Sequence, residues 1–349
     1  MWSELAVGYG LFILEILTLL LVIAGIIAMI IAFKQKKSHQ AGELVITDLS
    51  QEYKENTKRL ADFHLSEEAL KQIEKVRKKE EKQKSKLEKE RLKKDLDLEN
   101  QRKPHLFVLN FKGDILASET AALREEVSAI IAVAKPEDEV LLRLESPGGV
   151  VHGYGLAASQ LARLKKHQIK LTVAVDKVAA SGGYMMACVA DKIVAAPFAI
   201  IGSVGVVAQV PNIHRLLKKH NVDVDVMTAG EYKRTVTLLG ENTEKGKEKF
   251  QQELDETHQL FKQFVAQHRP QLIDIESIST GEHWFGEQAL GLKLIDDIAT
   301  SDDFILDAMQ DKLVLSVKYT IKKSFAQKLG KQVEKSMRNV FLGLLKYNN

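Results

Sequence analysis

The stretch LTVAVDKVAASGGYMMACVADKIVA, residues 171–195, decides the fold class of this chain. Its first part, LTVAVDKV, is a short apolar run of the length of a buried strand, and it ends at the turn ASGG. An apolar helix start, SGGYMMACVA, follows the turn, and a second strand-like run, DKIVAA, comes next. Short apolar strands that alternate with helices are typical of an α/β fold with a parallel sheet.

The same alternation extends outward from this stretch in both directions. Upstream lie HLFVLNFKG and EVLLRLES as strands, with AALREEVSAIIAVA and GYGLAASQLARLKKH as helices. Downstream, GSVGVVAQV is expected to form a strand, and residues 245–271 read as a long amphipathic helix. We therefore expect one α/β domain over residues 104–300, and a strand followed by a basic amphipathic helix over residues 301–349.

The first hundred residues have a different composition from this domain. Residues 11–33, LFILEILTLLLVIAGIIAMIIAF, are long and apolar enough for one transmembrane helix, so residues 1–33 are expected to form an anchor to a lipid bilayer. A cleaved signal peptide is the alternative, but no Lys or Arg precedes the apolar run. Residues 34–103 are densely charged and nearly free of glycine, which favours a solvated helical stalk.

Composition narrows the class of function. Hydrophobic residues make up 45% of the chain and the net charge is only +3, so no global field indicates nucleic-acid binding. Cys188 is the single cysteine, which excludes an internal disulfide and any metal site built from several cysteines. Lys34, Lys36 and Lys37 follow the apolar run, and this bias places the bulk of the chain in the cytoplasm.

Two glycine turns at strand ends carry the candidate chemistry. SPGG, residues 146–149, follows one predicted strand, and its bare amides can approach a ligand closely. In ASGG, residues 180–183, Ser181 stands where a strand becomes a helix, and this position suits a nucleophile beside oxyanion-binding amides. Serine is equally a common helix cap, so the turn alone leaves a structural role open.

The two turns, together with GSVGVV, GEYKR and STGEHWFGEQALGLKLIDDI, resemble the S49 peptidase family. Within that family, which contains the signal peptide peptidase A proteins, the match is closest to the SohB branch. The resemblance covers residues 104–299 and implies a ClpP/crotonase-like fold of repeated strand-strand-helix units. It also implies Ser181 as nucleophile, Lys233 as general base and Ser203 as the hydroxyl that orients the lysine. The oxyanion donors would be backbone N–H groups of Gly148, Gly149 and Gly182.

The resemblance further implies a serine endopeptidase that acts by acyl transfer without a metal or organic cofactor. Its substrates would be peptides or unfolded proteins, such as signal-peptide remnants and misfolded membrane or secreted proteins. Relatives assemble into homo-oligomers, and some complete the site with a neighbouring subunit. They reside in the bacterial inner membrane, and most work on its outer, periplasmic side, opposite to the side that the charge bias indicates.

Three other interpretations compete with a Ser/Lys protease. A Ser-His-Asp triad would draw its base from the histidines at positions 152, 167, 214 and 220, and their spacing favours none of them. A catalytically silent membrane scaffold would keep the fold without turnover. An acyl-CoA enzyme of the crotonase kind shares oxyanion geometry, but the apolar anchor and the Ser and Lys motifs argue against it.

Overall fold

The computed structural model describes residues 14–20, 22, 23, 25, 42–94, 102–272 and 274–321. Within these residues, no helix combines the length and the apolar character that a membrane crossing requires. Residues 11–13, 21, 24 and 26–33 of the expected anchor lie outside the described residues, as does the expected C-terminal helix after residue 321. Residues 44–319 form one compact unit, and residues 1–43 and 320–349 belong to another.

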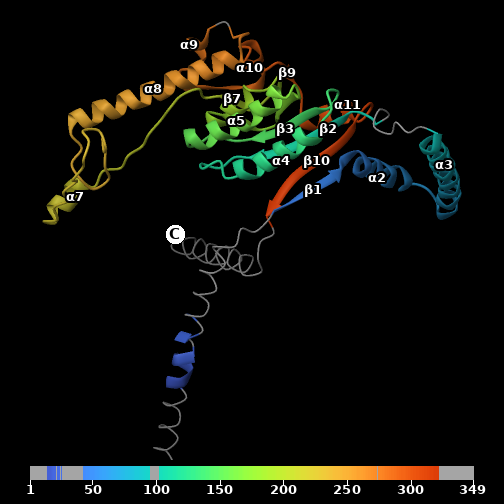
Figure 1. Cartoon of the computed structure of the whole chain (residues 1–349), viewed down its shortest axis with the longest axis horizontal. Coiled ribbons are helices and arrows are strands. Elements are labelled where there is room, and N and C mark those ends of the chain that lie inside the picture. The colour runs from blue at the N-terminus through green and yellow to red at the C-terminus, as the bar shows by residue number, and fades with distance from the viewer. Residues whose placement is uncertain are drawn as a thin grey trace, which may run out of the picture. The chain divides into compact units, whose positions relative to one another are not determined.

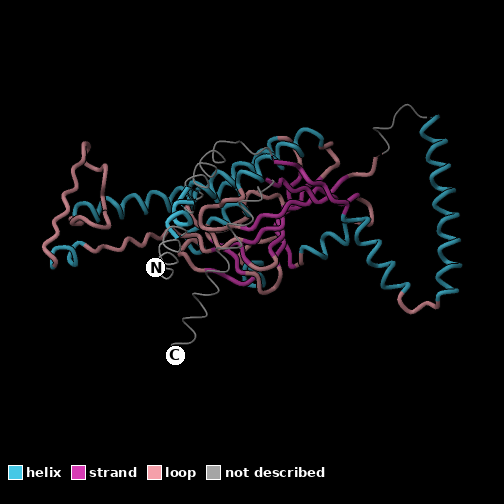
Figure 2. The backbone as a smooth tube through the Cα atoms, turned by 90° about the horizontal axis from the view of Figure 1, so that it is seen from below, coloured by secondary structure: helices cyan, strands magenta, loops and turns pink. Residues whose placement is uncertain are grey.

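A seven-stranded sheet forms the centre of the α/β fold, which confirms the expected fold class (Figure 1). Each of the five pairs from β10 to β9 is parallel. Figure 2 shows the strands gathered between the helices. In spatial order the strands are β1 (Gly42–Asp48), β10 (Leu313–Ile321), β2 (His105–Lys112), β3 (Glu139–Glu145), β4 (Lys170–Val175), β6 (Lys192–Ala195) and β9 (Asp297–Ile298).

Side chains of alternate residues along the strands enter two different cores. Phe107 and Leu109 of β2 face the larger core, where α4 (Thr120–Val133), α5 (Val151–Lys166) and α6 (Gly182–Ala187) pack. Leu106 and Val108 face the smaller core, which α11 (Ser301–Ala308) and α2 (Leu49–Asp62) cover. This period of two explains why the strands read as continuous apolar runs, since helices cover both faces of the sheet.

A second, three-stranded sheet consists of β5 (Val178–Ala180), β7 (Ile200–Gly202) and β8 (His283–Phe285). The run LTVAVDKV, predicted as one strand, is therefore two strands in different sheets, because the chain turns at Asp176. Both carboxylate oxygens of Asp176 accept hydrogen bonds from Ser301 at the start of α11, from its N–H at 2.7 Å and its hydroxyl at 2.6 Å. The strand expected over GSVGVVAQV, residues 202–210, is wrong: β7 ends at Gly202, and residues 203–210 form neither helix nor strand.

The expected uniform stalk differs from the structure, because residues 42–48 form strand β1 beside β10 in the main sheet. Helix α2 follows, and then α3 (Glu67–Lys94). The prediction missed β1 because GELVITD is short and stands among charged residues.

The segment from Val206 to Thr243, which we call the arm, leaves the body after β7 and returns at α8. The arm contains α7 (His214–Lys219), and no other helix or strand lies in it. Thr243 caps the next helix, since its hydroxyl oxygen accepts a hydrogen bond from the N–H of Gly246 at 3.1 Å. The helices that follow are α8 (Glu244–His268), α9 (Ile275–Ile278) and α10 (Gly286–Gly291).

Candidate active site

The two glycine turns predicted from the sequence lie directly against each other. Gly148 has φ +91°, and a Cβ atom placed on it would lie 2.8 Å from the carbonyl oxygen of Ala180, the nitrogen of Gly182 and the Cβ of Ser181. The bridge between Ser146 and Ala179 links the chain segments that lead into the two turns. Only glycine permits this approach, because any side chain would separate the two backbones.

Ser181 adopts a strained backbone conformation at the junction of β5 and α6. Its φ of 51° and ψ of −119° lie outside the regions that residues with a side chain normally occupy. Such conformations cost about 1–3 kcal/mol and persist where the surrounding structure enforces them, frequently at active sites. The N–H of Ser181 donates to the carbonyl oxygen of Gly202 at 2.7 Å. This hydrogen bond to the three-stranded sheet helps to keep Ser181 in the strained conformation.

Ser203 lies next to Ser181 because each serine follows one of two paired parallel strands. Ala180 of β5 is in register with Gly202 of β7, and neighbouring strands lie about 4.8 Å apart. Ser203 also has a positive φ, of 53°, and its hydroxyl donates to the carbonyl oxygen of Gly281 at 3.1 Å. The structure therefore brings together the two serines that the sequence singled out.

The three expected oxyanion donors are not equivalent. The N–H of Gly148 already donates to the hydroxyl oxygen of Ser146 at 3.1 Å. Within the residues that the structure describes, the N–H groups of Gly149 and Gly182 make no hydrogen bond to protein. These two amides are the ones that remain available to an anionic oxygen beside Ser181.

A buried pair of hydroxyl groups, which no pattern in the sequence indicated, supports the SPGG turn. The hydroxyls of Tyr154 and Ser146 lie 2.6 Å apart, and the Tyr154 hydroxyl donates to the carbonyl oxygen of Asp114 at 2.8 Å. Tyr154 is fully buried, and its ring fills the space where a side chain at Gly182 would lie. Tyr154 lies eight residues after Ser146, in the first turn of α5, and this spacing gave no sequence signal of the contact.

Ser181, Ser203 and the glycine turns line one cleft of about 1220 Å³. Its walls are mainly apolar and come from the start of α5, from α6, from the loop after β7 and from α8. Two histidines line it as well: His152, one of the alternative bases, and His258, whose imidazole Nε2 lies 3.3 Å from the carbonyl oxygen of Val204. The apolar lining residues include Val150, Val151, Met185, Val206, Phe261 and Phe264.

Lys233, the expected general base, does not line this cleft. It is exposed and lies on the arm, where its N–H donates to the carbonyl oxygen of Gly230. Its neighbours Glu231 and Tyr232 contact the first turns of α8: Lys245 pairs with Glu231 at 2.5 Å, and its ammonium lies 5.9 Å from the centre of the Tyr232 ring.

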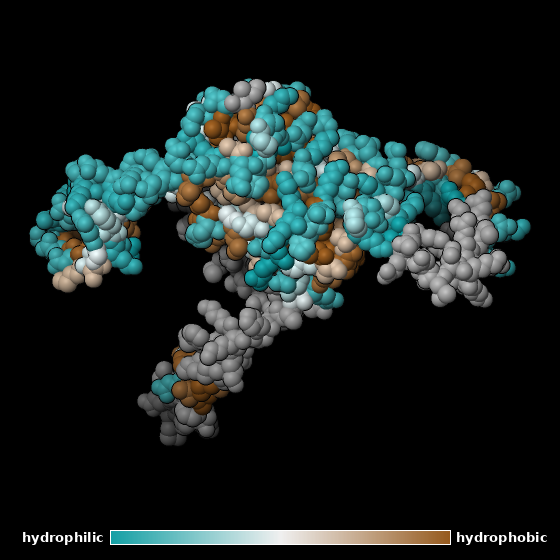
Figure 3. All heavy atoms as spheres, turned by 45° about the horizontal axis from the view of Figure 1, so that its top comes forward, coloured by the Kyte–Doolittle hydropathy of each residue, from teal (hydrophilic) through white to brown (hydrophobic). Residues whose placement is uncertain are grey.

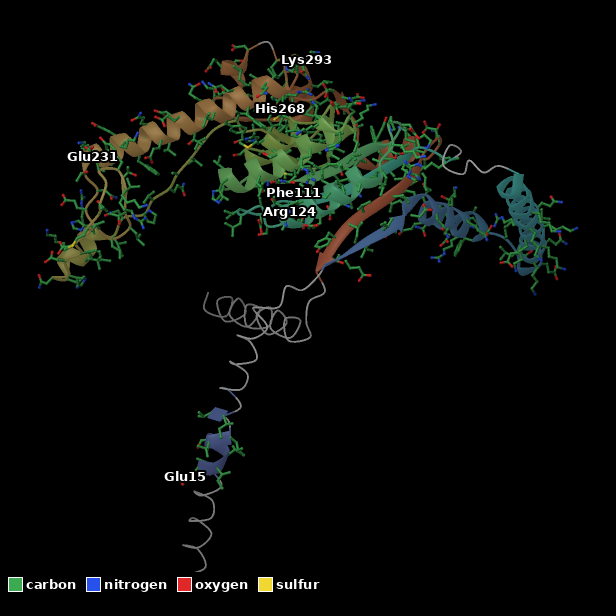
Figure 4. All side chains as sticks on the ribbon, in the orientation of Figure 1. Glu15, Phe111, Arg124, Glu231, His268 and Lys293 are labelled. Atoms are coloured by element: carbon green, nitrogen blue, oxygen red, sulfur yellow. The ribbon has the colours of Figure 1, made fainter. Side chains whose placement is uncertain are left out.

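The cleft touches α8 much farther along, at His258. Thirteen residues separate Lys245 from His258, which corresponds to about 20 Å along a helix that rises 1.5 Å per residue. In Figure 4, Glu231 accordingly lies at the outer end of α8, away from His268 at its other end. Within one chain, the arm therefore holds Lys233 away from Ser181.

Among the described residues, neither the cysteine nor a cluster of potential metal ligands offers a second reactive centre. Cys188 is fully buried, and burial raises the pKa of its thiol to about 12, so it remains protonated. In the part of the chain that the structure describes, no group of three His, Cys, Asp or Glu side chains lies together as a metal site would require.

A strained serine beside available backbone amides, in an apolar cleft of an α/β fold, defines a candidate hydrolase. Models of two parts of one family match the chain: the peptidase family S49 N-terminal part over residues 4–161, and the peptidase family S49 part over residues 163–315. The chain therefore belongs to peptidase family S49.

Two probable proteases agree with this membership over nearly the whole chain. A probable protease SohB of Haemophilus influenzae is 66% identical over 340 residues, which cover 97% of this chain and 96% of the relative. A probable protease SohB of Buchnera aphidicola subsp. Schizaphis graminum is 47% identical and covers 99% of this chain and 98% of its own length. A solved 1510-N membrane-bound stomatin-specific protease with a substrate peptide is 16% identical, with a TM-score of 0.41, and covers 66% of this chain and 98% of its own.

Proposed function

We propose that this peptidase is a serine endopeptidase in which Ser181 is the nucleophile and Lys233 the general base. The observation that carries the proposal is the strained turn at Ser181, which lies against a second glycine turn. Among the residues that the structure describes, the N–H groups of Gly149 and Gly182 beside it have no protein partner. A hydroxyl held there needs only a base to attack a peptide carbonyl. Family membership supports peptide bonds as the substrate.

The reaction would proceed by acyl transfer. A neutral Lys233 amine takes the proton from the Ser181 hydroxyl, whose oxygen bonds to the carbonyl carbon of the scissile peptide. The N–H groups of Gly149 and Gly182 bind the negative oxygen of the tetrahedral intermediate. The lysine ammonium then gives its proton to the leaving amine, and water, deprotonated by the same lysine, releases the acyl group from Ser181. The Ser203 hydroxyl orients the lysine amine by a hydrogen bond.

Lys233 would reach the cleft from a neighbouring copy of the chain. The arm that carries Lys233 exposes several large apolar side chains to solvent. Exposed apolar patches of this kind often mark a surface that binds another protein. Val207 is 83% exposed and Met227 is 91% exposed, with Leu216, Val222 and Val226 exposed beside them. Figure 3 shows apolar side chains at the surface of the arm's outer end among hydrophilic ones. Burial of the arm against a second copy would also dehydrate the ammonium and favour the neutral amine.

The apolar walls of the cleft suit hydrophobic peptide segments, including signal-peptide remnants and misfolded membrane or secreted proteins. We further propose that residues 1–33 anchor the chain in the bacterial inner membrane and that residues 104–300 form the protease domain in the ClpP/crotonase-like manner. Residues 301–349 would then return the chain through β10 to the terminal basic helix. Protease accessibility of the C-terminus in spheroplasts tests on which side of the membrane the domain lies.

Mixing two inactive variants tests both the chemistry and the shared site. Ser181→Ala removes the nucleophile and Lys233→Ala removes the base, so each variant alone is expected to lose peptide cleavage. Ser181→Ala should also lose labelling by a serine-directed probe. If neighbouring copies complete each site, co-assembled variants in equal amounts recover about a quarter of wild-type activity, because a random arrangement pairs an intact serine with an intact lysine at that frequency. Full activity of Ser181→Ala would refute the proposed nucleophile, and inactive mixed oligomers would refute the shared site.

A catalytically silent scaffold is the second candidate, and the position of Lys233 outside the cleft is the observation that favours it. A scaffold would keep its cellular effect when Ser181 is replaced by alanine. Loss of that effect in Ser181→Ala, with the variant still folded and assembled, would exclude the scaffold.

A further inference from the structure

Helix α3 presents a straight row of lysines. Lys71, Lys75, Lys78, Lys82 and Lys86, which we call the lysine stripe, are all exposed and follow one another at intervals of three or four residues. At about 100° per residue, these five positions fall within an arc of about 80° on the helix surface. The sequence continues the same spacing at Lys89 and Lys93.

The opposite side of α3 is the side that meets the rest of the chain. The guanidinium of Arg77 donates to the carboxylate of Asp62 at the end of α2, with the shortest bond at 2.9 Å. Leu70 and Ile73 share that side by helical spacing, and both are half-buried. The contact with α2 therefore leaves the exposed lysine stripe on the opposite, solvent side of α3. Figure 1 shows α2 and α3 as consecutive helices joined by a short loop.

The acidic side chains of α3 that the structure describes do little to neutralise the stripe. Among the side chains that the structure describes, only Lys78 has an acidic partner, Glu74, at 3.8 Å. Both side chains are more than half exposed, and exposed pairs of this kind contribute little energy. The other four stripe lysines make no ion pair with any described acid. Five positive charges thus point the same way over about 22 Å of helix, at 1.5 Å per residue.

We propose that the lysine stripe docks α3 along the surface of an anionic phospholipid bilayer. A straight row of point charges on one helix face matches a planar surface of negative headgroups, and juxtamembrane lysines bind such surfaces electrostatically. Nucleic acid fits less well, because α3 contains no aromatic residue to stack on bases and its one described arginine is already paired with Asp62. The stripe is a second membrane contact, separate from the proposed anchor in residues 11–33.

The test uses the full-length chain held in discs of neutral lipid, with binding to separate vesicles measured by flotation. Vesicles that contain phosphatidylglycerol should bind the discs, vesicles of phosphatidylcholine should not, and raised salt should release the bound discs because the contact is electrostatic. Equal binding to both kinds of vesicle, or binding that salt leaves unchanged, would overturn the proposal.

A matched variant keeps the composition and moves the charges. Exchanging residues 71 with 72, 74 with 75, and 82 with 83 carries three lysines off the stripe without altering net charge. Because each lysine near an anionic surface strengthens binding about fivefold, this exchange should weaken vesicle binding about 100-fold. Unchanged binding would show that total charge, and not the stripe, is responsible.

Two further measurements separate this proposal from the proposed function and from a nucleic-acid site. Peptide cleavage by the exchanged variant in neutral discs should equal that of the wild type, and the helical circular dichroism should be retained, so that a folding defect is recognised. Binding of duplex DNA or single-stranded RNA at the same salt concentration as tightly as phosphatidylglycerol vesicles would overturn the lipid assignment. Because Cys188 is fully buried, a dye on the variant Lys79→Cys reports from α3 alone. Its fluorescence should be quenched by headgroup-labelled anionic vesicles.

Discussion

Gly148→Ala is the substitution that tests the contact between the two glycine turns most directly. The added Cβ would lie 2.8 Å from three atoms of the Ala180–Gly182 turn, whereas ordinary contacts begin near 3.4 Å. The two turns must therefore move apart by about 0.6 Å. In addition, alanine at φ +91° carries a conformational penalty of about 1–3 kcal/mol.

The expected effect on catalysis exceeds the effect on stability. A displacement approaching 1 Å between nucleophile and oxyanion donors costs about 100-fold in rate, so kcat/KM for an unfolded-protein substrate should fall about 100-fold. Labelling of Ser181 by a serine-directed probe should slow in parallel, because it depends on the same geometry. The free energy of unfolding, measured in urea, should fall by about 1–3 kcal/mol from the strained backbone alone.

Gly230→Ala provides the control for backbone strain. Gly230 has φ +97°, but a Cβ atom there would have no neighbour within 4 Å. The loss of stability in Gly230→Ala therefore measures the cost of alanine at a positive φ alone. Any additional loss in Gly148→Ala measures the steric conflict between the added Cβ and the Ala180–Gly182 turn. Wild-type kcat/KM in Gly148→Ala would refute the conclusion that close contact of the two turns forms the site.

Four other substitutions probe the support of the site, the core and, as a control, the surface. Tyr154→Phe should lower the free energy of unfolding by about 1–3 kcal/mol in urea and lower kcat/KM, because it removes the hydrogen-bond partner of the buried Ser146 hydroxyl next to the SPGG turn. Wild-type values of both would show that Tyr154 does not support the turn. Burial raises the pKa of Glu126 to about 7, so the folded chain holds this proton more tightly than the unfolded chain, and stability should fall by about 3 kcal/mol as pH rises from about 4.5 to about 7. In Glu126→Gln, the free energy of unfolding should change much less between these two pH values. An unchanged pH dependence would show that another group causes it. Arg269→Ala should lower the free energy of unfolding by about 3–5 kcal/mol, because it removes the buried ion-pair partner of the Asp296 carboxylate. Lys192→Ala breaks an exposed ion pair and should lower it by less than about 1 kcal/mol. Equal losses in the two variants would contradict the difference expected between buried and exposed ion pairs.

Local patterns predicted β3, β4, α5 and α6 around the candidate site, because burial on both faces of the sheet leaves a continuous apolar signal. They placed the strand near Ser203 too late in the sequence, since β7 ends at Gly202. They did not predict where the chain changes sheet. LTVAVDKV reads as one strand, and the break at Asp176 depends on hydrogen bonds from Ser301, which is 125 residues away. Strand β1 escaped prediction for a similar reason, since its pairing with β10 joins distant parts of the sequence.

At the candidate site too, the sequence predicted local features but not contacts between distant residues. Ser181 and Gly148 stand in turns whose glycines mark them locally, and the structure brings these residues together. The support from Tyr154 and Ser146 arises from packing between a helix and a turn, which no spacing rule encodes. Lys233 was assigned from family resemblance alone, and its place on the arm could not be deduced from its neighbours in the sequence.

The two halves of the proposed site differ in how firmly a single chain holds them. The nucleophile side is rigid: Ser181 is fixed through Gly202, and the opposing turn is fixed through the buried Ser146 and Tyr154 hydroxyls. The base side is an exposed segment, and several of its apolar side chains, among them Val207 and Met227, are left uncovered by the residues that the structure describes. If the arm docks on a second copy, the same burial that stabilises the assembly brings the lysine to the serine and dehydrates it. An isolated chain would then keep its nucleophile without a base, which would restrict peptide cleavage to the assembled protease.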